Sequence, residues 1–330
     1  MIIINYMSKY LVVGGAGYIG GVCVEKMIDR GDEVVILDNL KTGHKENVHP
    51  KATFYLGDKG DGTILDKIFT EQQIDTVLDF AGLIQVGESV KEPSIYFQNN
   101  LGQGMNLLDG MVRNNVKKII FSSTAAVFGN PKVVPINEDV EKDPINPYGE
   151  SKYFFEKVIK RYAEAYELKY TIFRYFNACG ATLQSKEQHA QESHLIPLIF
   201  QAVKGERPNI AIFGTDYDTP DGTCIRDYVH VSDLIDAHLL AIQKMATSPT
   251  NEYNLGNGSG YSVKEVIAAV EKVTGKPVPI VTAERRAGDP ARLVASSEKA
   301  KAELRWVPKF PEIEQIIASA WEAEIKPPQK

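Results

Sequence analysis

The chain has 330 residues and a formal net charge of -6, which argues against a nucleic-acid-binding surface, and no basic cluster offsets that charge. Hydrophobic residues make up 43% of the sequence and charged residues 24%, as in ordinary globular proteins, and no apolar run approaches the roughly 18 residues of a membrane span. Three widely spaced cysteines without a Cys-x-x-Cys pair indicate neither a disulfide framework nor a zinc site, so we expect a cytoplasmic protein without a metal.

The N-terminal elements form a predicted βαβ unit around a glycine-rich turn. Its parts are a short apolar strand, the turn, a helix and a second buried strand, at residues 11–13, 14–20, 22–30 and 34–37. Side chains at Gly14 or Gly17 would block the tight turn and the approach of a pyrophosphate to backbone N–H groups, and Gly20 lets the helix lie close to the strand. Asp38 ends the second strand, where its carboxylate can accept hydrogen bonds from a ribose 2′-OH but would repel a 2′-phosphate. The unit therefore predicts an NAD site rather than an NADP site.

The next two predicted strands also end in candidate cofactor contacts. Residues 53–56 lead to Asp58, which can meet an adenine amino group at the carboxyl end of a strand or can be an ordinary turn aspartate. Residues 76–80 lead to Ala81 and Gly82, whose small size suits backbone packed against the diphosphate of the cofactor.

A long helix is predicted from about Tyr96 to Asn114. Four apolar side chains share one face of it: Leu101, Met105, Leu108 and Val112. We expect this stripe to face the core or an interface.

The strand predicted at residues 118–124 ends in hydroxyl side chains, from Ser122 to Thr124, at the edge where open α/β sheets bind ligands. The next helix begins with Tyr148 and Lys152, one turn apart on one face. Tyrosine titrates near 10, so a phenolate at pH 7 needs a pKa about three lower, which is about 4 kcal/mol of differential stabilisation. An adjacent ammonium and the cationic nicotinamide ring can supply it, and we interpret Tyr148 and Lys152 as catalytic.

The helix that carries Tyr148 extends to about Tyr166 and is apolar over an arc too wide for a single contact. The apolar side chains are Phe154, Phe155, Val158, Ile159, Tyr162 and Tyr166. One side would cover the sheet, and the rest would contact another helix or a second subunit. We therefore hypothesise a homodimer that forms through this helix and the one at residues 101–112.

The character of the sequence changes after the strand predicted at residues 170–175. Residues 181–194 are polar and irregular, which indicates a domain boundary. His189 and His194 lie five residues apart without a carboxylate or cysteine at metal-ligand spacing, so we expect a surface loop rather than a metal site. A helix, a strand and an acidic loop follow at residues 196–204, 210–213 and 216–222.

Isolated arginines mark the second half of the chain. Arg226, Arg285 and Arg286 stand in a region that has few other cations. Guanidinium groups match phosphate oxygens in bidentate fashion, so a phosphorylated substrate is expected in this half, with solvated surface arginines as the alternative.

With these residues assembled, the chain resembles the UDP-galactose 4-epimerases, NAD-dependent members of the extended short-chain dehydrogenase/reductases. That superfamily shares the wide glycine spacing and the Tyr148-x-x-x-Lys152 pair. More specific motifs are Phe80-Ala-Gly82, Val86-Gly-Glu-Ser89, Arg174-Tyr-Phe-Asn177, the run from Ile212 to Thr223, Arg226-Asp-Tyr-Val-His230 and Arg286-Ala-Gly-Asp289. The resemblance covers about residues 8–310.

The resemblance implies an isomerase of galactose metabolism that holds NAD tightly and interconverts UDP-galactose and UDP-glucose. Tyr148 would remove the O4 proton while hydride leaves C4 for NAD; the 4-keto sugar would turn over and take hydride back on its other face. Lys152 would hold the nicotinamide ribose and lower the pKa of Tyr148, and Thr124 would hydrogen-bond the sugar O4. Arg226 and Arg286 would anchor the diphosphate while the sugar rotates.

The resemblance also implies two sets of binding residues. The NAD site would comprise Gly14, Gly17, Tyr18, Ile19, Gly20, Asp38, Asn39, Asp58, Phe80, Ala81, Gly82, Asn99, Ser122, Tyr148, Lys152 and Tyr175. The substrate site would comprise Thr124, Tyr148, Asn177, Leu195, Phe213, Arg226, Tyr228, Arg286, Asp289 and Leu293. Family members often have lysine where Ile84 stands and asparagine where His194 stands, so neither position is counted as a contact.

The range of sugars accepted is expected to depend on Leu293. In the family, a tyrosine four places after the acid of the Arg-x-Gly-Asp motif is associated with exclusion of an N-acetyl group. Leu293 holds that place here, and it is smaller and has no hydroxyl group. Epimerisation of UDP-N-acetylglucosamine, alone or in addition, is therefore the alternative activity.

Three other functions are weighed against the epimerase. Nucleotide-sugar 4,6-dehydratases need an Asp-Glu pair directly after the strand-end threonine, where this chain has Ala125 and Ala126. A dehydrogenase that releases its reduced cofactor is less favoured, and a non-catalytic NAD-binding sensor is disfavoured because Tyr148 and Lys152 are both present.

The sequence thus predicts an α/β chain with a Rossmann-type, doubly wound parallel sheet and a smaller α/β substrate-binding domain. We expect residues 7–180 to bind NAD and residues 181–330 to bind the UDP-sugar, with part of residues 225–255 returning to the first sheet. The expected partners are nucleotide sugars and a second copy of the chain, and neither nucleic acid nor membrane.

Overall fold

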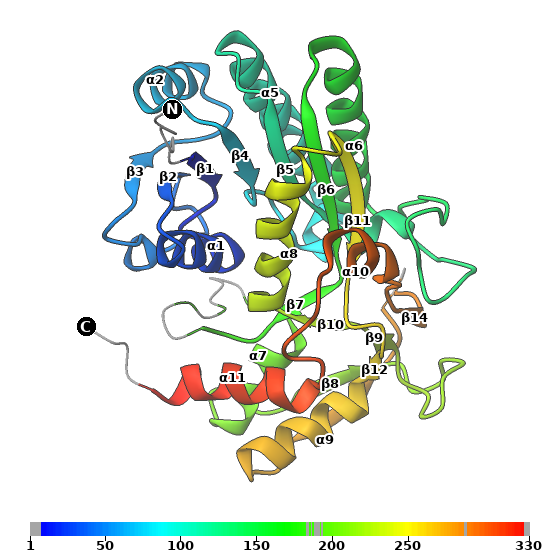
Figure 1. Ribbon diagram of the computed structural model, residues 1–330. Coiled ribbons are helices and arrows are strands. Elements are labelled where there is room, and N and C mark those ends of the chain that lie inside the picture. The colour runs from blue at the N-terminus through cyan, green and yellow to red at the C-terminus, as the bar shows by residue number, and fades with distance from the viewer. Residues whose placement is uncertain are drawn as a thin grey trace.

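The computed structural model describes residues 8–182, 185, 187, 192, 194–286 and 289–326. Its centre is a sheet of seven parallel strands in the order β11-β6-β5-β4-β1-β2-β3 (Figure 1). The strands are β1 (Lys9–Val13), β2 (Glu33–Asp38), β3 (Thr53–Leu56), β4 (Thr76–Asp79), β5 (Lys118–Thr124), β6 (Lys169–Tyr175) and β11 (Thr250–Leu255). After β3 the chain returns to place β4 on the other side of β1. Ligands of open sheets bind at such a reversal, outside the carboxyl ends of the strands.

Helices cover both faces of this sheet (Figure 1). One face carries α1 (Tyr18–Asp29), α8 (Val231–Lys244) and α10 (Glu298–Leu304), and the other carries α2 (Gly62–Gln72), α5 (Gln103–Arg113) and α6 (Pro147–Tyr166). Because successive strand side chains point to opposite faces, Val12 packs toward α1 and Leu11 toward α2. Burial on both faces explains why the strands read as continuous apolar runs.

A smaller layer adjoins the edge where the strands end, in the lower part of Figure 1. In it, α7 (Leu195–Val203), α9 (Val263–Thr274) and α11 (Ile313–Ile325) pack around the paired strands β8 (Ile210–Phe213) and β13 (Ile280–Ala283). Short strands link the layers: β7 (Asn177–Cys179) pairs with β10 (Tyr228–His230), and β9 (Ile225–Arg226) lies between β12 (Tyr261–Ser262) and β14 (Arg292–Leu293). The second half of the chain also supplies β11 and α8 to the large sheet and its cover.

The helix predicted from Tyr96 to Asn114 is interrupted. The structure has α3 (Val86–Lys91), α4 (Pro93–Tyr96), a π-helical segment at Phe97–Gly102 and then α5. Because a π turn holds more residues than an α turn, it shifts the face on which later side chains point. Of the predicted stripe, Leu108 is buried in the core and Met105 is 39% exposed, while Leu107, outside the stripe, is also buried.

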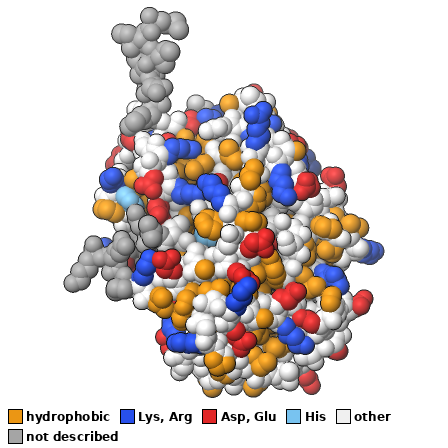
Figure 2. Space-filling view, turned by 60° about the horizontal axis from the view of Figure 1, so that its bottom comes forward, with side chains coloured by type: hydrophobic (Ala, Val, Ile, Leu, Met, Phe, Trp, Pro, Cys, Tyr) orange, Lys and Arg blue, Asp and Glu red, His pale blue; other side chains and the backbone are white. Residues whose placement is uncertain are grey.

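Other element boundaries agree with the sequence prediction to within a few residues. The first helix begins at Tyr18 rather than residue 22, and the helix expected at residues 196–204 begins at Leu195. The remaining short segments are 3-10 turns at Lys45–Asn47 and Ala125–Phe128. Within the described ranges, the helices are all too short or too polar to cross a membrane. On the face shown in Figure 2, acidic, basic and hydrophobic side chains are interspersed.

Candidate active site

The glycine-rich turn between β1 and α1 leaves no room for side chains at two of its glycines. Gly14 has a φ of +81°, and a Cβ on it would lie 2.9 Å from the backbone nitrogen of Ala81, after β4. A Cβ on Gly20 would lie 2.1 Å from the carbonyl oxygen of Gly14. Gly17 precedes α1 and has no side chain that could cap the helix. The first N–H groups of the helix can therefore bind an anion. The turn therefore fits the diphosphate of a dinucleotide.

Polar residues at the ends of β2 and β3 meet beside that turn. Asp38 is 8% exposed, and its carboxylate accepts hydrogen bonds from the backbone nitrogens of Ala16, at 3.0 Å, and Leu40, at 2.9 Å. Asn39 Nδ2 donates to Asp58 Oδ2 at 3.1 Å. The structure thus places Asp38 against the glycine turn and brings Asn39 and Asp58 together, as an NAD ribose and adenine would require.

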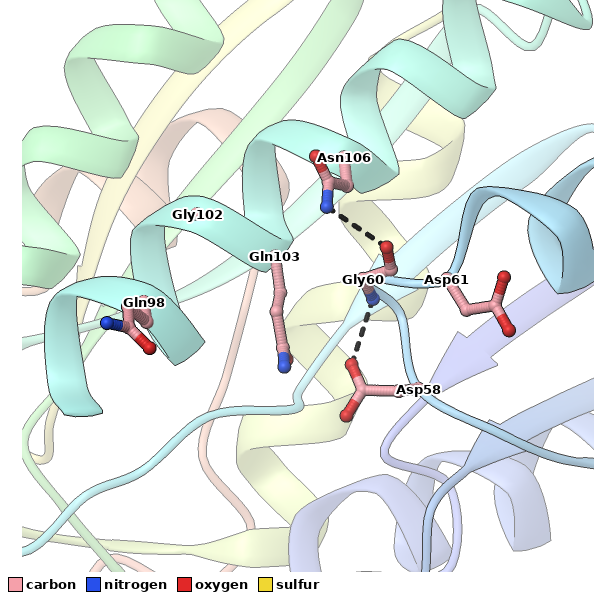
Figure 3. A pocket seen from close by; sticks show the side chains of 7 residues that line it. All are labelled: Asp58, Gly60, Asp61, Gln98, Gly102, Gln103 and Asn106. Carbon is pink, nitrogen blue, oxygen red and sulfur yellow. Dashed lines mark hydrogen bonds between the residues drawn. The ribbon is translucent and has the colours of Figure 1, made fainter.

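A hollow of about 590 Å³ opens beside Asp58 (Figure 3). It is lined by Asp58, Gly60, Asp61, Gln98, Gly102, Gln103 and Asn106. Asn106 Nδ2 donates to the carbonyl oxygen of Gly60 at 3.0 Å, and Gly60 N donates to Asp58 Oδ1 at 2.9 Å. The predicted contact Asn99 lies on the same helical segment and donates to Gln103 Oε1 at 3.2 Å. Sequence reasoning did not single out the other polar residues here, which are Asp61, Gln98, Gln103 and Asn106.

The two catalytic candidates lie in the first turns of α6. Asn146 fixes the start of this helix: its side-chain oxygen accepts a backbone N–H three residues later, at 2.9 Å, and Pro147 occupies the first position. Tyr148 is half-buried. Lys152 is buried, and its Nζ donates to the carbonyl oxygen of Ser122, near the end of β5, at 2.8 Å.

The chain by itself shifts the pKa values of both candidates. Burial raises the pKa of Tyr148, and a hydrogen bond with Thr124 opposes that rise. Burial, and then the charge of Lys59, lower the pKa of Lys152 to about 7. The pKa of Tyr148 is thus shifted opposite to the direction that a base requires, and positive charge nearby would oppose that shift.

A buried ion pair holds α6 against the sheet. Arg174 on β6 and Glu156 on α6 both have 0% side-chain exposure, and Nη2 of the arginine lies 2.6 Å from Oε2 of the glutamate. Ser123 Oγ donates to Glu156 Oε1 at 2.5 Å, and Glu252 on β11 lies 2.5 Å from the same guanidinium. Glu156 lies one turn beyond Lys152 on α6. These bonds therefore fix which face of α6 points toward the end of β5.

Tyr175, a predicted cofactor contact, is held by a histidine that sequence reasoning missed. The Tyr175 hydroxyl lies 2.5 Å from His238 Nε2, and His238 Nδ1 lies 2.8 Å from the carbonyl oxygen of Leu234. Burial lowers the pKa of His238 to about 4, so its neutral ring donates from Nδ1 and accepts from Tyr175. Phe80 packs on the same ring, with centroids 5.3 Å apart. A single histidine in an amphipathic helix gave no signal in the sequence.

Five predicted substrate contacts form two groups in the second half of the chain. The strand register places Leu293 opposite Arg226, and Arg226 forms an ion pair with Asp289. The guanidinium of Arg286 lies 4.0 Å from the centroid of the Phe213 ring. Cations beside an aromatic face can hold a diphosphate and a flat base.

The other predicted substrate contacts lie in the supporting strands and helix. Asn177 pairs with Tyr228 in the register of β7 and β10, and its Nδ2 donates to the carbonyl oxygen of Asp227 at 2.8 Å. Leu195 begins α7 and packs in the same core as the buried Tyr228. Arg285 points elsewhere, toward the acidic loop, where it lies 2.7 Å from Asp216.

The expectation that His194 lacks a carboxylate partner is wrong. His194 Nδ1 lies 2.8 Å from Glu187 Oε1 and 3.2 Å from Glu192 Oε1. Burial alone would lower the pKa of His194, but hydrogen bonds to the two glutamates raise it to about 10. His194 therefore lies within ion-pair distance of two carboxylates, and spacing did not reveal Glu187 because it lies seven residues away in the sequence. His189 lies outside the described residues.

Comparisons with known proteins found a family model, relatives and solved structures that are similar to this chain. Residues 10–256 match the model of the NAD dependent epimerase/dehydratase family. The UDP-glucose 4-epimerase of Halalkalibacterium halodurans is 50% identical over 314 residues, 94% of each chain. Two solved structures are also similar: UDP-glucose 4-epimerase from Brucella ovis in complex with NAD (TM-score 0.92, 39% identity, 96% and 98% coverage) and that from Bifidobacterium longum in complex with NAD+ and UDP (TM-score 0.91, 38% identity, 96% and 99% coverage).

Proposed function

The chain belongs to the NAD dependent epimerase/dehydratase family, and from that membership we propose that it interconverts UDP-galactose and UDP-glucose on bound NAD. One observation carries the proposal. Tyr148 and Lys152 stand beside Thr124 at the carboxyl end of β5, and the backbone of Ala81 and Gly82 links Lys152 to the glycine turn. The glycine-rich turn and the candidate acid-base residues thus lie together at the edge of the sheet where ligands of this fold bind.

The residues have separate tasks in this reaction. NAD, when bound, supplies a hydride acceptor and donor. Tyr148 takes the proton of the sugar O4 and returns it, while Thr124 hydrogen-bonds the same oxygen and Lys152 binds the nicotinamide ribose. Arg226 and Arg286 hold the diphosphate, so that the 4-keto sugar can turn over without leaving the site.

The alternatives fit the site less well. Ala125 and Ala126 follow Thr124, and Ala125 is buried in an apolar cluster, so this position offers no acid or base for a dehydratase. To test the function, the purified protein is incubated with UDP-galactose without added reductant, and the nucleotide sugars are resolved. We expect UDP-glucose. A 4-keto-6-deoxy sugar would indicate a dehydratase, net reduced cofactor a dehydrogenase, and an unchanged substrate a sensor.

Replacement of Asp38 by alanine is expected to weaken NAD binding and relax discrimination against NADP, because the clash between the carboxylate and a 2′-phosphate is removed. Calorimetric titration of the cofactor-stripped protein with each dinucleotide measures both effects. Asp32→Ala, just before the other end of β2, is the matched control and should keep the preference for NAD. Equal affinity of the native protein for NAD and NADP would contradict this role of Asp38.

Leu293 is proposed to leave room beside the 2-position of the sugar. It packs against the apolar cluster that contains Ala125, next to the end of β5. We therefore expect some turnover of UDP-N-acetylglucosamine, which Leu293→Tyr should suppress while UDP-galactose turnover stays mostly intact. Leu293→Met, similar in volume, should keep both activities. If the native enzyme shows no conversion of N-acetyl sugars even on long incubation, another residue closes the pocket.

We also propose a cytoplasmic homodimer. Exposed apolar side chains gather on α3 to α6: Val86, Val90, Ile95, Met105, Phe154 and Tyr166. Phe154 stacks on Phe97 of the π-helical segment, which ties these helices into one surface. A second copy of the chain is proposed to cover this surface, and a monomeric mass in sedimentation at micromolar concentration would exclude the dimer.

The proposed domain division is an NAD-binding domain at residues 7–180 and a UDP-sugar-binding domain at residues 181–330.

A further inference from the structure

A second buried lysine lies beside the site and has no task in the reaction above. Lys59 lies in the sequence between Asp58 and Gly60, and its side chain is 3% exposed. Its Nζ donates to both carboxylate oxygens of Asp79, at 3.0 and 2.8 Å, and to the carbonyl oxygen of Ala81 at 2.7 Å. All three ammonium protons are therefore used inside the protein.

Packing alone does not require an ion pair at this place. Two charges removed from water cost several kcal/mol each, and apolar residues of similar volume often give equal or greater stability. An apolar pair, however, could not bind the backbone of Ala81. The carbonyl oxygen of Ala81 accepts from Lys59, and its N–H donates to Asp79 Oδ1 at 3.2 Å. The ion pair thus fixes both polar groups of the residue that follows Phe80 at the end of β4.

Ala81 and Gly82 lie between the glycine-rich turn and Lys152. On one side, Ala81 N is the atom nearest to a Cβ built on Gly14, at 2.9 Å. On the other, a Cβ built on Gly82 would lie 3.1 Å from Lys152 Nζ and 3.0 Å from Asn100 Oδ1. A displacement of this backbone would therefore disturb the glycine turn and Lys152 together.

The pair also acts on Lys152 through its charges. The charged groups around Lys152 are Lys59 from the turn after β3, Asp79 from β4 and Glu156 from α6, with Tyr148 on the same helix. After burial, the charge of Lys59 is the strongest influence that lowers the pKa of Lys152, and Asp79 and Glu156 oppose it. Loss of Lys59 should raise that pKa whether Asp79 stays ionised or takes up a proton.

We propose that Lys59 and Asp79 are positioning residues for the reaction, which hold the backbone of Ala81 and Gly82 against the ammonium group of Lys152. The inference rests on the proposed function, in which Lys152 binds the nicotinamide ribose and supports Tyr148. Neither residue is among the predicted cofactor or substrate contacts.

The test uses Lys59→Met and the double variant Lys59→Met/Asp79→Leu, which leaves no charge unpaired. The double variant should melt close to the wild-type temperature, because removing two buried charges offsets the loss of the two bonds to Ala81. Its turnover of UDP-galactose should nevertheless fall roughly tenfold or more, with little change in KM, because displaced catalytic groups lose rate rather than substrate contacts. Calorimetry should show weaker NAD binding by the stripped protein. The alkaline limb of the pH profile of kcat should move to higher pH in both variants.

Lys118→Met is the matched control, because it breaks the 2.9 Å pair between Lys118 and Asp75 at the opposite end of β4 and β5. It should behave as wild type in every measurement. A double variant with wild-type turnover, NAD affinity and pH profile would overturn the inference. So would a double variant that melts well below wild type with an unshifted pH profile, since the pair would then serve only the fold. A wild-type protein inactive in the same assay would instead refute the proposed function.

Discussion

Replacing Tyr148 by phenylalanine is expected to lower epimerase turnover by a factor of about 10² to 10⁴, the usual contribution of a positioned base. The substitution removes the hydroxyl group that takes the O4 proton but keeps the ring, which packs edge-on to Tyr96 with centroids 6.4 Å apart. The fold and the bound NAD should therefore be retained. Steady-state conversion of UDP-galactose, together with the NAD content of the purified variant, measures both effects.

Tyr153→Phe provides the control on the same helix. Tyr153 is half-buried, and its ring lies 4.3 Å from the Nζ of Lys157, a contact that phenylalanine preserves. This variant should keep wild-type turnover. Near-wild-type turnover of Tyr148→Phe would show that the base lies elsewhere.

Arg174→Met is expected to produce the largest loss of stability, roughly 3 to 5 kcal/mol. Glu156 would keep its hydrogen bond to Ser123 but would be left as a fully buried carboxylate without a cation. A melting temperature lower by roughly 5 to 10 °C should result. Activity measured below that temperature should also fall, because the same pair orients α6.

Arg161→Met is the matched control for charge removal from an ion pair. Arg161 lies on α6 and pairs with Glu164 at 2.8 Å, with side-chain exposures of 80% and 64%. An exposed pair of this kind contributes about 0 to 1 kcal/mol, so the melting temperature should hardly change. If Arg161→Met lowered the melting temperature as much as Arg174→Met, burial would not be the reason that the Arg174 pair stabilises the fold.

Local patterns were sufficient for much of the fold and site. The strand at Lys118–Thr124 and the helix start at Pro147 follow from an apolar run and from an Asn-Pro pair, so both are found where the sequence predicts them. The spacing of Tyr148 and Lys152 places them on one helix face regardless of the tertiary structure. Likewise, the steric demands at Gly14 and Gly20 are visible in the glycine spacing alone.

The features that sequence reasoning missed depend on tertiary contacts. The π-helical segment at Phe97–Gly102 has no composition that distinguishes it from an α-helix. The Lys59–Asp79 pair joins two strand ends that lie twenty residues apart, and single charged residues near strand ends normally indicate solvent exposure. His194 was misjudged for the same reason, since its partner Glu187 lies seven residues away in the sequence.

The most direct test of the proposed reaction follows the hydrogen at C4. UDP-galactose that carries deuterium at C4 is incubated with the purified protein, and the UDP-glucose formed is examined by mass spectrometry and NMR. If Tyr148 cycles only the O4 proton while the C4 hydride leaves and returns within one site, the deuterium should remain at C4 and no reduced cofactor should accumulate. Loss of the label to solvent, or stoichiometric accumulation of reduced cofactor, would contradict the account.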